Sequence, residues 1–597
     1  MSRLVLLTAL TGLASGVIAL DRTPQFHQLH KRLGGTLFDF IPATEETLAW
    51  QPCSSNTSHD DDDGLDPTLL CAKLLVPRDY LNASDTLTYA IAMIKKPAAI
   101  SESSPDWRGP VFFNPGGPGI EAINSFRVNF TMGARLQSFL GPNYSVVSID
   151  PRSVGYSEPV INCEDSVAEF QVGYDRLFAS FRSPLTGGIE AMGEQLALYE
   201  EYNGKCIRKF NGTDNPLRFV GTAAVARDML RVSDMMWKDA GRKVPKGLQY
   251  WGASYGTTLG QYFATLFPDR VERVVLDAVG DGEEWQTTYD NEVNWVDTLD
   301  DVLYTGFSGY CAASKACLLN PHGTETRASI NRRIRKILEH IKRQPFVPEG
   351  TGKTISFFNL SSFLYANFYS TIRTFPRIAL VLSFLEQEVV LANKRVVKIP
   401  SEVNRWTEWA IPDQRCEILA GGDMPYTKTG TPSDAFNFIK CSDRTVFEKL
   451  ELDKMMKVHD KIVRKSEIGT VQTFNVLGCS LFDDPKQYQA VEVVPKVGAK
   501  KTKFPIFFTS HTIDPVTPLK NAFNMQKVFP GSGVLEQYSV GHLVLTWPSK
   551  CTLKYVLEYF ETGKVPKYVG CGVDEGPWGV KGELVKGKGS KGKRWLW

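Results

Sequence analysis

The segment Gly252-Ala253-Ser254-Tyr255-Gly256 constrains the fold most strongly, because it has the form Gly-x-Ser-x-Gly and joins two elements of different period. The run Leu248-Gln249-Tyr250-Trp251 before it is strand-like, and residues 257–267 after it have a helical pattern. A serine on such a sharp strand-to-helix turn has strained backbone angles and exposes its hydroxyl above the sheet. The alternative is an ordinary Gly/Ser loop. We predict that Ser254 is a nucleophile.

Two parts of the chain alternate short apolar runs with helical patterns, as a parallel sheet requires. Strands are expected at 87–94, 109–113, 144–149, 247–251, 271–277, 504–509 and 534–538, and helices at 221–241, 518–529 and 550–562. Residues 281–503 have mainly helical patterns. We therefore predict an α/β fold in which residues 33–280 and 504–575 form one mostly parallel central sheet flanked by helices, with residues 281–503 as a helical cap inserted between the two parts. The Gly- and Lys-rich residues 576–597 are expected to form a flexible basic tail.

The N-terminal residues predict export. Arg3 precedes an apolar run over residues 4–20, and Val17 and Ala19 supply the small side chains that a signal peptidase requires. We expect residues 1–19 to be a cleaved signal peptide; a signal anchor is the alternative, although the run is short for a bilayer core. The Lys31-Arg32 pair either ends a short propeptide, residues 20–32, or stays uncut. A secreted, extracellular protein with no membrane partner is predicted.

The cysteines and sequons fit the same oxidising export route. The chain has 11 cysteines, and their spacing favours the local pairs Cys53–Cys71, Cys163–Cys206, Cys311–Cys317, Cys441–Cys479 and Cys551–Cys571, with Cys416 left unpaired. Sequence alone does not fix this connectivity. The candidate glycosylation sites are Asn56, Asn82, Asn129, Asn143, Asn211 and Asn359.

Charge and histidine content exclude several function classes. The 68 Lys and Arg balance 66 Asp and Glu, so no strong field favours nucleic acid. No Cys-x-x-Cys pair occurs and there are only eight histidines, which argues against a structural zinc site. The acidic run Asp60–Asp63 lacks the spaced ligands of a calcium loop and is interpreted as a solvated loop. We predict no metal and no cofactor.

A serine hydroxyl needs a histidine base, and that histidine needs an orienting carboxylate. In α/β folds with this turn the chain order is Ser, then acid, then His. His542 is the only histidine after the last predicted strand, and Asp514 follows the strand at 504–509, which makes them the candidate base and acid. Asp514 could instead cap the following helix, and His511 is expected to have a hydrogen-bonded structural role.

The loop Asn114-Pro115-Gly116-Gly117-Pro118-Gly119 follows a predicted strand where this fold places its second oxyanion donor. Glycines permit close backbone approach, so the Gly117 N–H and the Tyr255 N–H are the candidate donors. A plain Gly/Pro turn is the competing interpretation.

These motifs together resemble secreted tripeptidyl aminopeptidase-like serine peptidases, which have the α/β-hydrolase fold and stand beside the prolyl aminopeptidases. The resemblance runs from about residue 70 to 575 and includes Asp150-Pro151-Arg152-Ser153-Val154-Gly155, Phe438-Ile439-Lys440-Cys441-Ser442-Asp443, Asp514-Pro515-Val516-Thr517-Pro518, and a C-terminal module closed by Cys551 and Cys571. It implies that Ser254 is the nucleophile, Asp514 the acid, His542 the base, and Gly116-Gly117 the oxyanion loop. Relatives usually have Asp-x-Arg-Gly-x-Gly, so Ser153 departs from the pattern and leaves the local turn open.

The resemblance also implies release of short peptides or single residues from free amino termini. The substrate ammonium group would need an anion, because a desolvated charge without a partner is costly. Glu283 and Glu284 follow the strand at 271–277 and are candidates, although solvated surface glutamates are the simpler interpretation. A carboxylesterase and a non-catalytic binding protein remain alternatives. Residue preference, length of the released peptide and oligomeric state stay open.

Overall fold

The computed structural model describes residues 38, 40–53, 66–126, 132–166, 183–212, 215–244, 246–287, 289–352, 354–403, 432–581 and 584–585, with residues 169, 173 and 177. Several predicted features lie outside the described residues: the signal peptide 1–19, the segment 20–32, the acidic run at 60–63, Cys416, the sequons Asn56 and Asn129, and the tail from residue 586.

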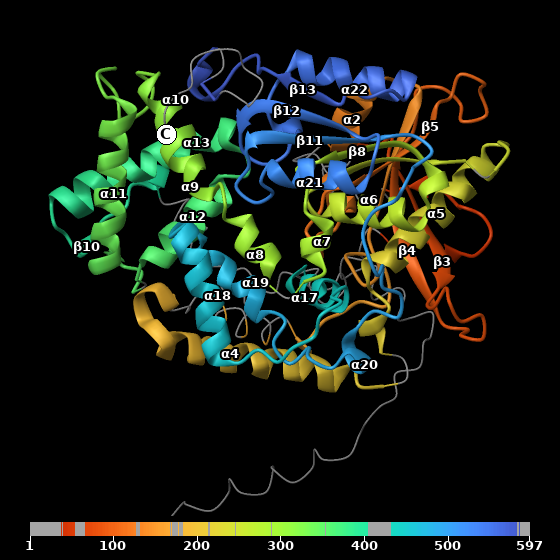
Figure 1. Ribbon diagram of the computed structural model, residues 1–597, viewed down its shortest axis with the longest axis horizontal. Helices are drawn as coiled ribbons and strands as arrows, with labels where there is room; N and C mark the ends of the chain where they lie inside the picture. Colours follow the sequence, from red (N-terminus) through yellow and green to blue (C-terminus); the bar gives the residue numbers. More distant parts are fainter. Residues whose placement is uncertain are drawn as a thin grey trace, which may run out of the picture.

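An 11-stranded sheet forms the centre of the described part of the chain (Figure 1). Its order is β1-β3-β4-β6-β5-β7-β8-β11-β12-β13, and β2 pairs with β3. All neighbours from β6 to β13 are parallel, whereas β4 pairs antiparallel with both β3 and β6. The strands are β1 (Ala43–Thr44), β2 (Gln51–Pro52), β3 (Leu70–Pro77), β4 (Thr88–Lys96), β5 (Gly109–Asn114), β6 (Tyr144–Ile149), β7 (Leu248–Ala253), β8 (Val271–Asp277), β11 (Ile506–Ile513), β12 (Gly533–Val540) and β13 (Tyr568–Cys571).

The predicted α/β fold with a mostly parallel sheet is confirmed, and all seven predicted strands are present. The sequence pattern missed four strands near the ends of the sheet. In β3 the charged Lys73 interrupts the apolar run that would have predicted a strand. The strand tolerates this residue because its ammonium group pairs with Glu158 at 3.2 Å. The strands β1, β2 and β13 span only two to four residues, too few to show a period.

Successive residues of the central strands pack into two different cores, because side chains alternate across a sheet. On one face lie Val111, Val146, Trp251 and Val275, and on the other Phe112, Val147, Tyr250 and Val274. Helices α2 (Met132–Leu140) and α22 (Lys550–Thr562) cover the first face through Leu136 and Val556. Helices α5 (Thr222–Asp239), α6 (Tyr255–Leu266) and α21 (Lys520–Val528) cover the second. Burial on both faces explains why these strands are apolar throughout.

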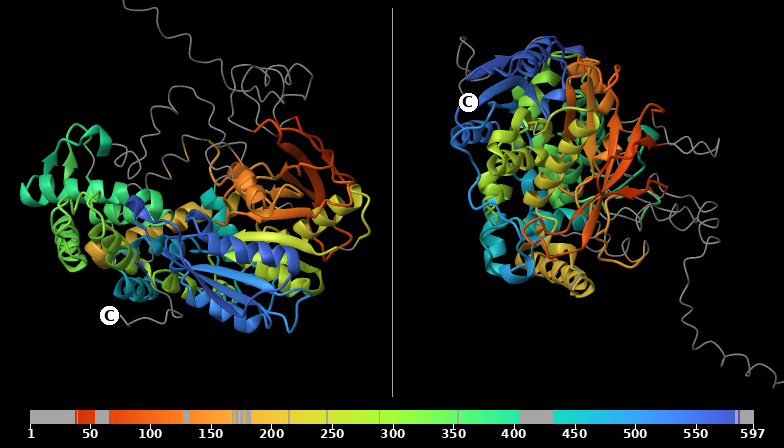
Figure 2. Two further views of the ribbon diagram at one scale, coloured as in Figure 1. Left: turned by 90° about the horizontal axis from the view of Figure 1, so that it is seen from above. Right: turned by 90° about the vertical axis from the view of Figure 1, so that its right-hand side faces the viewer.

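The elements between β8 and β11, here called the helical insertion, are almost entirely helical. They are α7 (Gly282–Trp285), α8 (Asp290–Trp295), α9 (Leu299–Asp301), η5 (Val302–Phe307), α10 (Ser308–Ala312), α11 (Arg327–Arg343), α12 (Phe357–Asn367), α13 (Thr371–Phe384), η6 (Leu385–Leu391), α17 (Pro432–Ser442), α18 (Leu452–Lys465), η7 (Ile468–Gln472), α19 (Thr473–Leu477) and α20 (Pro485–Tyr488), with a small ribbon of β9 (Val347–Pro348) and β10 (Val396–Val397). Helices α10 and α11, green in the pictures, lie beside the sheet in Figure 1 and in the left view of Figure 2.

Helix α4 (Pro184–Lys209) precedes β7 in the sequence but packs with the helical insertion (Figure 1). The Asn203 amide donates to the carbonyls of Gly478 and Ser480, at 3.1 and 2.9 Å, and Tyr202 bonds with Asp434 of α17. The boundary predicted at residue 281 therefore does not separate all the helices that pack together there. A boundary read along the sequence cannot show this, because α4 joins the insertion only through tertiary contacts.

Five disulfides join the cysteine pairs that the spacing favoured, Cys53–Cys71, Cys163–Cys206, Cys311–Cys317, Cys441–Cys479 and Cys551–Cys571. Such a set fits an oxidising, extracytoplasmic compartment. In the part of the chain that the structure describes, we found no helix with the length and hydropathy of a membrane span.

The remaining described elements are short 3-10 turns. They are η1 (Ile123–Phe126), η3 (Pro216–Arg218), η4 (Pro268–Arg270), η8 (Val544–Thr546) and η9 (Pro577–Gly579).

Candidate active site

Ser254 lies on a strained turn between the end of β7 and the start of α6. Its φ of 55° is rare for a residue with a side chain. The positions of Gly252 and Gly256 have no space for a side chain. A Cβ at Gly252 would lie 2.3 Å from the Gly256 carbonyl oxygen, and one at Gly256 would lie 2.7 Å from the Asn114 carbonyl oxygen. This geometry matches the expected strand-turn-helix and not an ordinary loop.

Asp514 and His542 lie in direct contact. Nδ1 of His542 is 3.0 Å from both carboxylate oxygens of Asp514, and both side chains are buried. Asp514 is fixed by its own turn, because its Oδ1 accepts the N–H groups of Val516 and Thr517 at 2.9 and 2.8 Å. It does not cap α21, which begins at Lys520 after Leu519 as N-cap. The contact assigns the proton to Nδ1 and leaves the Nε2 lone pair as the basic site.

Asp277, the last residue of β8, connects the serine turn with the histidine loop. Its carbonyl accepts the Ser254 N–H at 3.0 Å, and its Oδ1 accepts the N–H of Val544 at 2.9 Å, two residues after His542. Nε2 of His542 is buried and has no hydrogen-bond partner among the described residues.

His511 has the structural role that we expected. One ring nitrogen bonds with the Leu543 carbonyl at 2.8 Å and the other with the Ser539 hydroxyl, so neither is free. Burial lowers the pKa of His511 to about 4, which keeps the ring neutral. His511 therefore supports the loop that carries His542, whose neighbour Leu543 has a φ of 70°.

The Gly116-Gly117 loop lies against Ser254. A Cβ at Gly116 would lie 2.8 Å from the Ser254 Cβ and 3.0 Å from the Tyr255 nitrogen. The Gly116 N–H donates to the Asn114 side chain at 2.9 Å, so of the two glycines it is Gly117 whose N–H stays a candidate oxyanion donor. Tyr255 is the first residue of α6, where a backbone N–H has no partner within the helix.

The Asp150 motif forms a buried turn despite its departure from the usual pattern. Ser153, which replaces the usual glycine, has a φ of 60°. Asp150 accepts the N–H groups of Ile123 and Tyr156 at 3.0 and 2.9 Å, and Arg152 forms a two-pronged pair with Asp228 at 2.6 and 2.8 Å. The turn therefore tolerates serine at the cost of a backbone conformation that glycine adopts more easily.

The two predicted amine-binding residues differ in their surroundings. Glu283 is exposed, whereas Glu284 is half-buried and accepts a hydrogen bond from the Asn294 amide. Burial, and to a smaller extent the neighbouring carboxylate of Asp281, together raise the pKa of Glu284 to about 7. Within the described ranges, neither residue forms a hydrogen bond with Ser254, Asp514 or His542.

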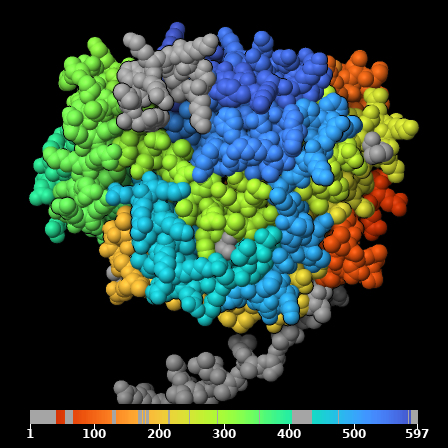
Figure 3. Space-filling view, in the orientation of Figure 1, coloured from red at the N-terminus to blue at the C-terminus, as the bar shows by residue number. Residues whose placement is uncertain are grey.

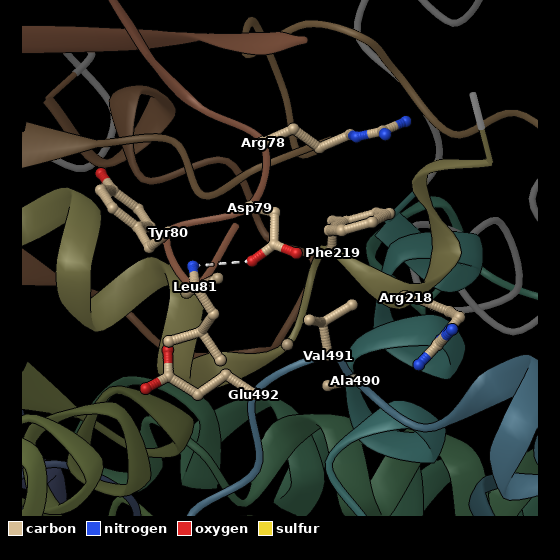
Figure 4. Close-up of a pocket in the computed structure, with 11 residues that line it drawn as sticks. Arg78, Asp79, Tyr80, Leu81, Arg218, Phe219, Ala490, Val491 and Glu492 are labelled. Atoms are coloured by element: carbon tan, nitrogen blue, oxygen red, sulfur yellow. Dashed lines mark hydrogen bonds between the residues drawn. The ribbon is translucent and has the colours of Figure 1, made fainter. Parts of the chain in front are cut away.

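Two surface hollows lie away from these residues. One has a volume of about 20 Å³, room for about one water, and is lined by residues 78–81, Arg218, Phe219, Gly221, Ala224 and residues 490–492 (Figure 4). There the Leu81 N–H donates to Asp79 at 2.8 Å. The other has a volume of about 250 Å³ and lies between Asn320, Glu325 and Arg333. Neither is lined by Ser254, Asp514 or His542.

Of the described sequons, Asn82 and Asn211 are exposed and Asn143 is partly exposed. Asn359 is 8% exposed, and its side-chain oxygen accepts the Ser356 N–H at 2.9 Å in the cap of α12. We found no cluster of three potential metal ligands in the described part of the molecule.

Sequence reasoning missed two side chains of this site. Asn114 ends β5 and orients the glycine loop, and Asp277 ends β8 and bonds with the histidine loop. The signal that would have found them is a polar residue at the carboxyl end of an apolar strand, where parallel strands place their functional groups.

Comparison with known families is consistent with this geometry. The family model described as "alpha/beta hydrolase fold" matches residues 109–428, more than half of the chain, and the one described as "TAP-like protein" matches residues 465–571. The chain belongs to the alpha/beta hydrolase family and carries a TAP-like C-terminal region.

The relatives found by sequence are distant. Serine protease Hip1 of Mycobacterium tuberculosis is 29% identical over 294 residues, 48% of this chain and 49% of that protein. Tripeptidyl aminopeptidase of Streptomyces coelicolor is 27% identical over 341 residues, 56% of each chain. Carboxylesterase B of Mycobacterium tuberculosis is 30% identical over 162 residues, 27% of this chain and 28% of that protein. The chain thus spans about half the length of the first two relatives.

Proposed function

We propose that this protein is a secreted serine exopeptidase that removes short peptides or single residues from free amino termini. The observation that carries the proposal is the buried contact of His542 Nδ1 with Asp514 at 3.0 Å, in a loop that Asp277 joins to the strained strand-to-helix turn of Ser254. The similarity to a tripeptidyl aminopeptidase and a serine protease supports peptides as the substrate class.

In the proposed reaction, Nε2 of His542 takes the proton of the Ser254 hydroxyl as its oxygen attacks the scissile carbonyl. Asp514 holds the imidazole in the required tautomer and stabilises the imidazolium that forms. The Gly117 and Tyr255 N–H groups stabilise the oxyanion of the tetrahedral intermediate. His542 then protonates the leaving amine, and water hydrolyses the acyl-enzyme at Ser254. No cofactor takes part.

Glu284 is the better candidate of the two glutamates for the substrate ammonium group. Burial has already raised its pKa, so an arriving cation would stabilise its carboxylate. We expect Glu284→Gln to raise KM about tenfold for peptides with a free amino terminus and to leave N-acetylated peptides unaffected. The exposed Glu283→Gln is the matched control, and equal effects on both substrates would remove Glu284 from the proposal.

The proposal is tested by labelling the full chain with a fluorophosphonate probe and by following peptide fragments by mass spectrometry. We expect covalent label on the wild type, none on Ser254→Ala, and full label on Ser510→Ala, a buried serine of β11. A peptide mixture should lose its N-terminal residues with unlabelled wild type and with Ser510→Ala, and not with Ser254→Ala or with wild type that has been labelled beforehand. Absence of label on folded wild-type protein would favour a binding protein that uses the same fold.

An esterase is the second candidate, since carboxylesterase B is also among the relatives and the same three residues cleave either bond. Peptidyl anilides and butyrate esters separate the two. A peptidase should have the higher kcat/KM on the anilide when the peptide carries a free amine. Turnover of the esters alone would support the esterase.

A further inference from the structure

The corner between α12 and α13, residues 368–370, contacts the loop that carries His542. The Tyr369 carbonyl accepts the backbone N–H of His542 at 3.0 Å. The Thr371 hydroxyl donates to the carbonyl of Val540, just before that loop. The helical insertion therefore contacts the candidate base directly. Figure 3 shows parts of the insertion beside the C-terminal elements on the surface of the molecule.

The side chain of Tyr369 also contacts the imidazole. The two ring centroids lie 5.1 Å apart and the planes meet at 77°, an edge-to-face arrangement. Tyr365, one turn earlier in α12, fixes the position of the Tyr369 ring through two contacts. The two tyrosine hydroxyls are 3.1 Å apart and the ring centroids are 5.6 Å apart. Although it packs against a buried histidine, Tyr369 is 37% exposed. One part of an aromatic ring beside the base thus stays open to a ligand.

The chemistry of acyl transfer decides which part of a substrate meets this ring. Nδ1 of His542 is occupied by Asp514, so Nε2 must deliver the proton to the leaving group. That transfer needs the leaving atom within roughly 3 Å of Nε2. The leaving group therefore passes beside the imidazole, within the range of a ring whose centroid is 5.1 Å from it. The acyl part lies at the oxyanion loop, on the other side of the scissile bond.

We propose that Tyr369, held by Tyr365, is a specificity-determining residue for the leaving group and favours an aromatic or flat apolar residue directly after the cleaved bond. The proposal rests on the hydrolase function above and extends it to the leaving-group side. Aromatic pairs add selectivity through edge-to-face or offset contacts, which amounts to a preference of about three- to tenfold over a residue without a side chain.

The test uses the acyl-enzyme itself. A peptidyl methyl ester generates it whether the protein is a peptidase or an esterase, and added amines then compete with water for it. We expect phenylalaninamide to capture the wild-type acyl-enzyme about three to ten times better than glycinamide. Tyr369→Ala should reduce this ratio to about one. The ratio compares two amines on the same acyl-enzyme, so a change in the rate at which Tyr369→Ala forms that acyl-enzyme does not affect it.

Three further variants make the result decisive. Tyr369→Phe keeps the ring and should keep the preference for phenylalaninamide. Tyr369→Leu keeps apolar volume without an aromatic edge and should lower the ratio, so it replaces the alanine variant if that variant does not fold. Tyr304→Ala removes a partly buried tyrosine elsewhere in the helical insertion, under Arg335, and should leave the ratio unchanged. An unchanged ratio in both Tyr369→Ala and Tyr369→Leu would overturn the proposal while leaving the hydrolase function intact. Failure of the wild type to form an acyl-enzyme from any ester would instead overturn both.

Discussion

The turn that carries Ser254 and the loop that carries His542 are held in different ways. The serine turn is fixed by neighbouring backbone, which packs so closely against Gly252 and Gly256 that a side chain would not fit at either position. Its N–H bonds with the Asp277 carbonyl at 3.0 Å, and its carbonyl accepts the Thr257 hydroxyl at 2.6 Å. These contacts come from the sheet and the helix that continues the turn.

The histidine loop depends on residues from distant segments. Gly541 bonds with the Ile513 carbonyl at 2.9 Å, His542 with the Tyr369 carbonyl, and Val544 with the Asp277 carboxylate. One of these partners, Tyr369, belongs to the helical insertion. The difference teaches that the sheet and the helix that follows the turn set the position of the nucleophile, whereas the position of the base also depends on how the insertion packs.

The largest effect is expected from the histidine side. Asp514→Asn keeps the shape of the turn but removes the charge that selects the Nδ1–H tautomer, and we expect kcat to fall about 10⁴-fold. Steady-state kinetics on the best anilide or ester, with a thermal unfolding curve to verify the fold, measures it. A loss smaller than tenfold in a folded variant would mean that Asp514 does not orient the base.

Asp277 contacts both the serine turn and the histidine loop. Its protonation should therefore appear in the pH dependence of stability. Burial raises the pKa of Asp277 to about 6, above the value of 3.8 expected in the unfolded chain. The folded state therefore binds the proton more tightly, so this stabilising contribution is present below about pH 4 and is lost as the pH rises through 6. It amounts to roughly 3 kcal/mol.

In Asp277→Asn this contribution is absent. The unfolding free energy of the wild type, measured relative to that of the variant, should fall as the pH rises from 4 to 6. Urea unfolding at several pH values measures it. Parallel curves for the two proteins across this range would contradict the prediction. Because the Asn side chain retains an acceptor for the Val544 N–H, the loop itself should keep its place.

Two buried threonines test the comparison directly. Thr257 donates to the Ser254 carbonyl and accepts the Gly280 backbone N–H at 2.8 Å. Thr371 donates to the Val540 carbonyl and accepts the indole N–H of Trp547 at 3.2 Å. Each change to valine should cost about 1–3 kcal/mol of stability. Only Thr371→Val should also lower kcat, by about tenfold, because a displaced base is poorly aligned. An equal or larger kcat loss in Thr257→Val would refute the contrast.

The smallest effect is expected at Ser153, which shares its positive φ with Ser254 but lies away from the candidate triad. Ser153→Gly relieves the strain, although glycine also gains freedom in the unfolded chain. We expect a stabilisation below about 1 kcal/mol and unchanged kcat, measured by thermal unfolding and steady-state assays. A clear loss of stability would show that the Ser153 hydroxyl, and not the backbone, matters at this turn.

Local signals were sufficient for much of this molecule. The strands β5, β6, β7 and β8 could be predicted because burial on both faces makes them continuous apolar runs, and Ser254 because its turn requires the two glycines. The contact of Asp514 with His542 was anticipated from chain order. The partnership of α4 with the insertion, the bond of Asp277 with Val544, and the position of Tyr369 could not be predicted in this way.

The sequence by itself determined which segments become strands, where the chain turns sharply, and which chemical groups stand at those turns, since these depend on a few adjacent residues. Only the tertiary structure decided which distant segments hold the histidine loop and what lies beside the imidazole. The physical reason is that such contacts join residues as far apart as Tyr369 and His542, and periodicity carries no information about which surfaces meet.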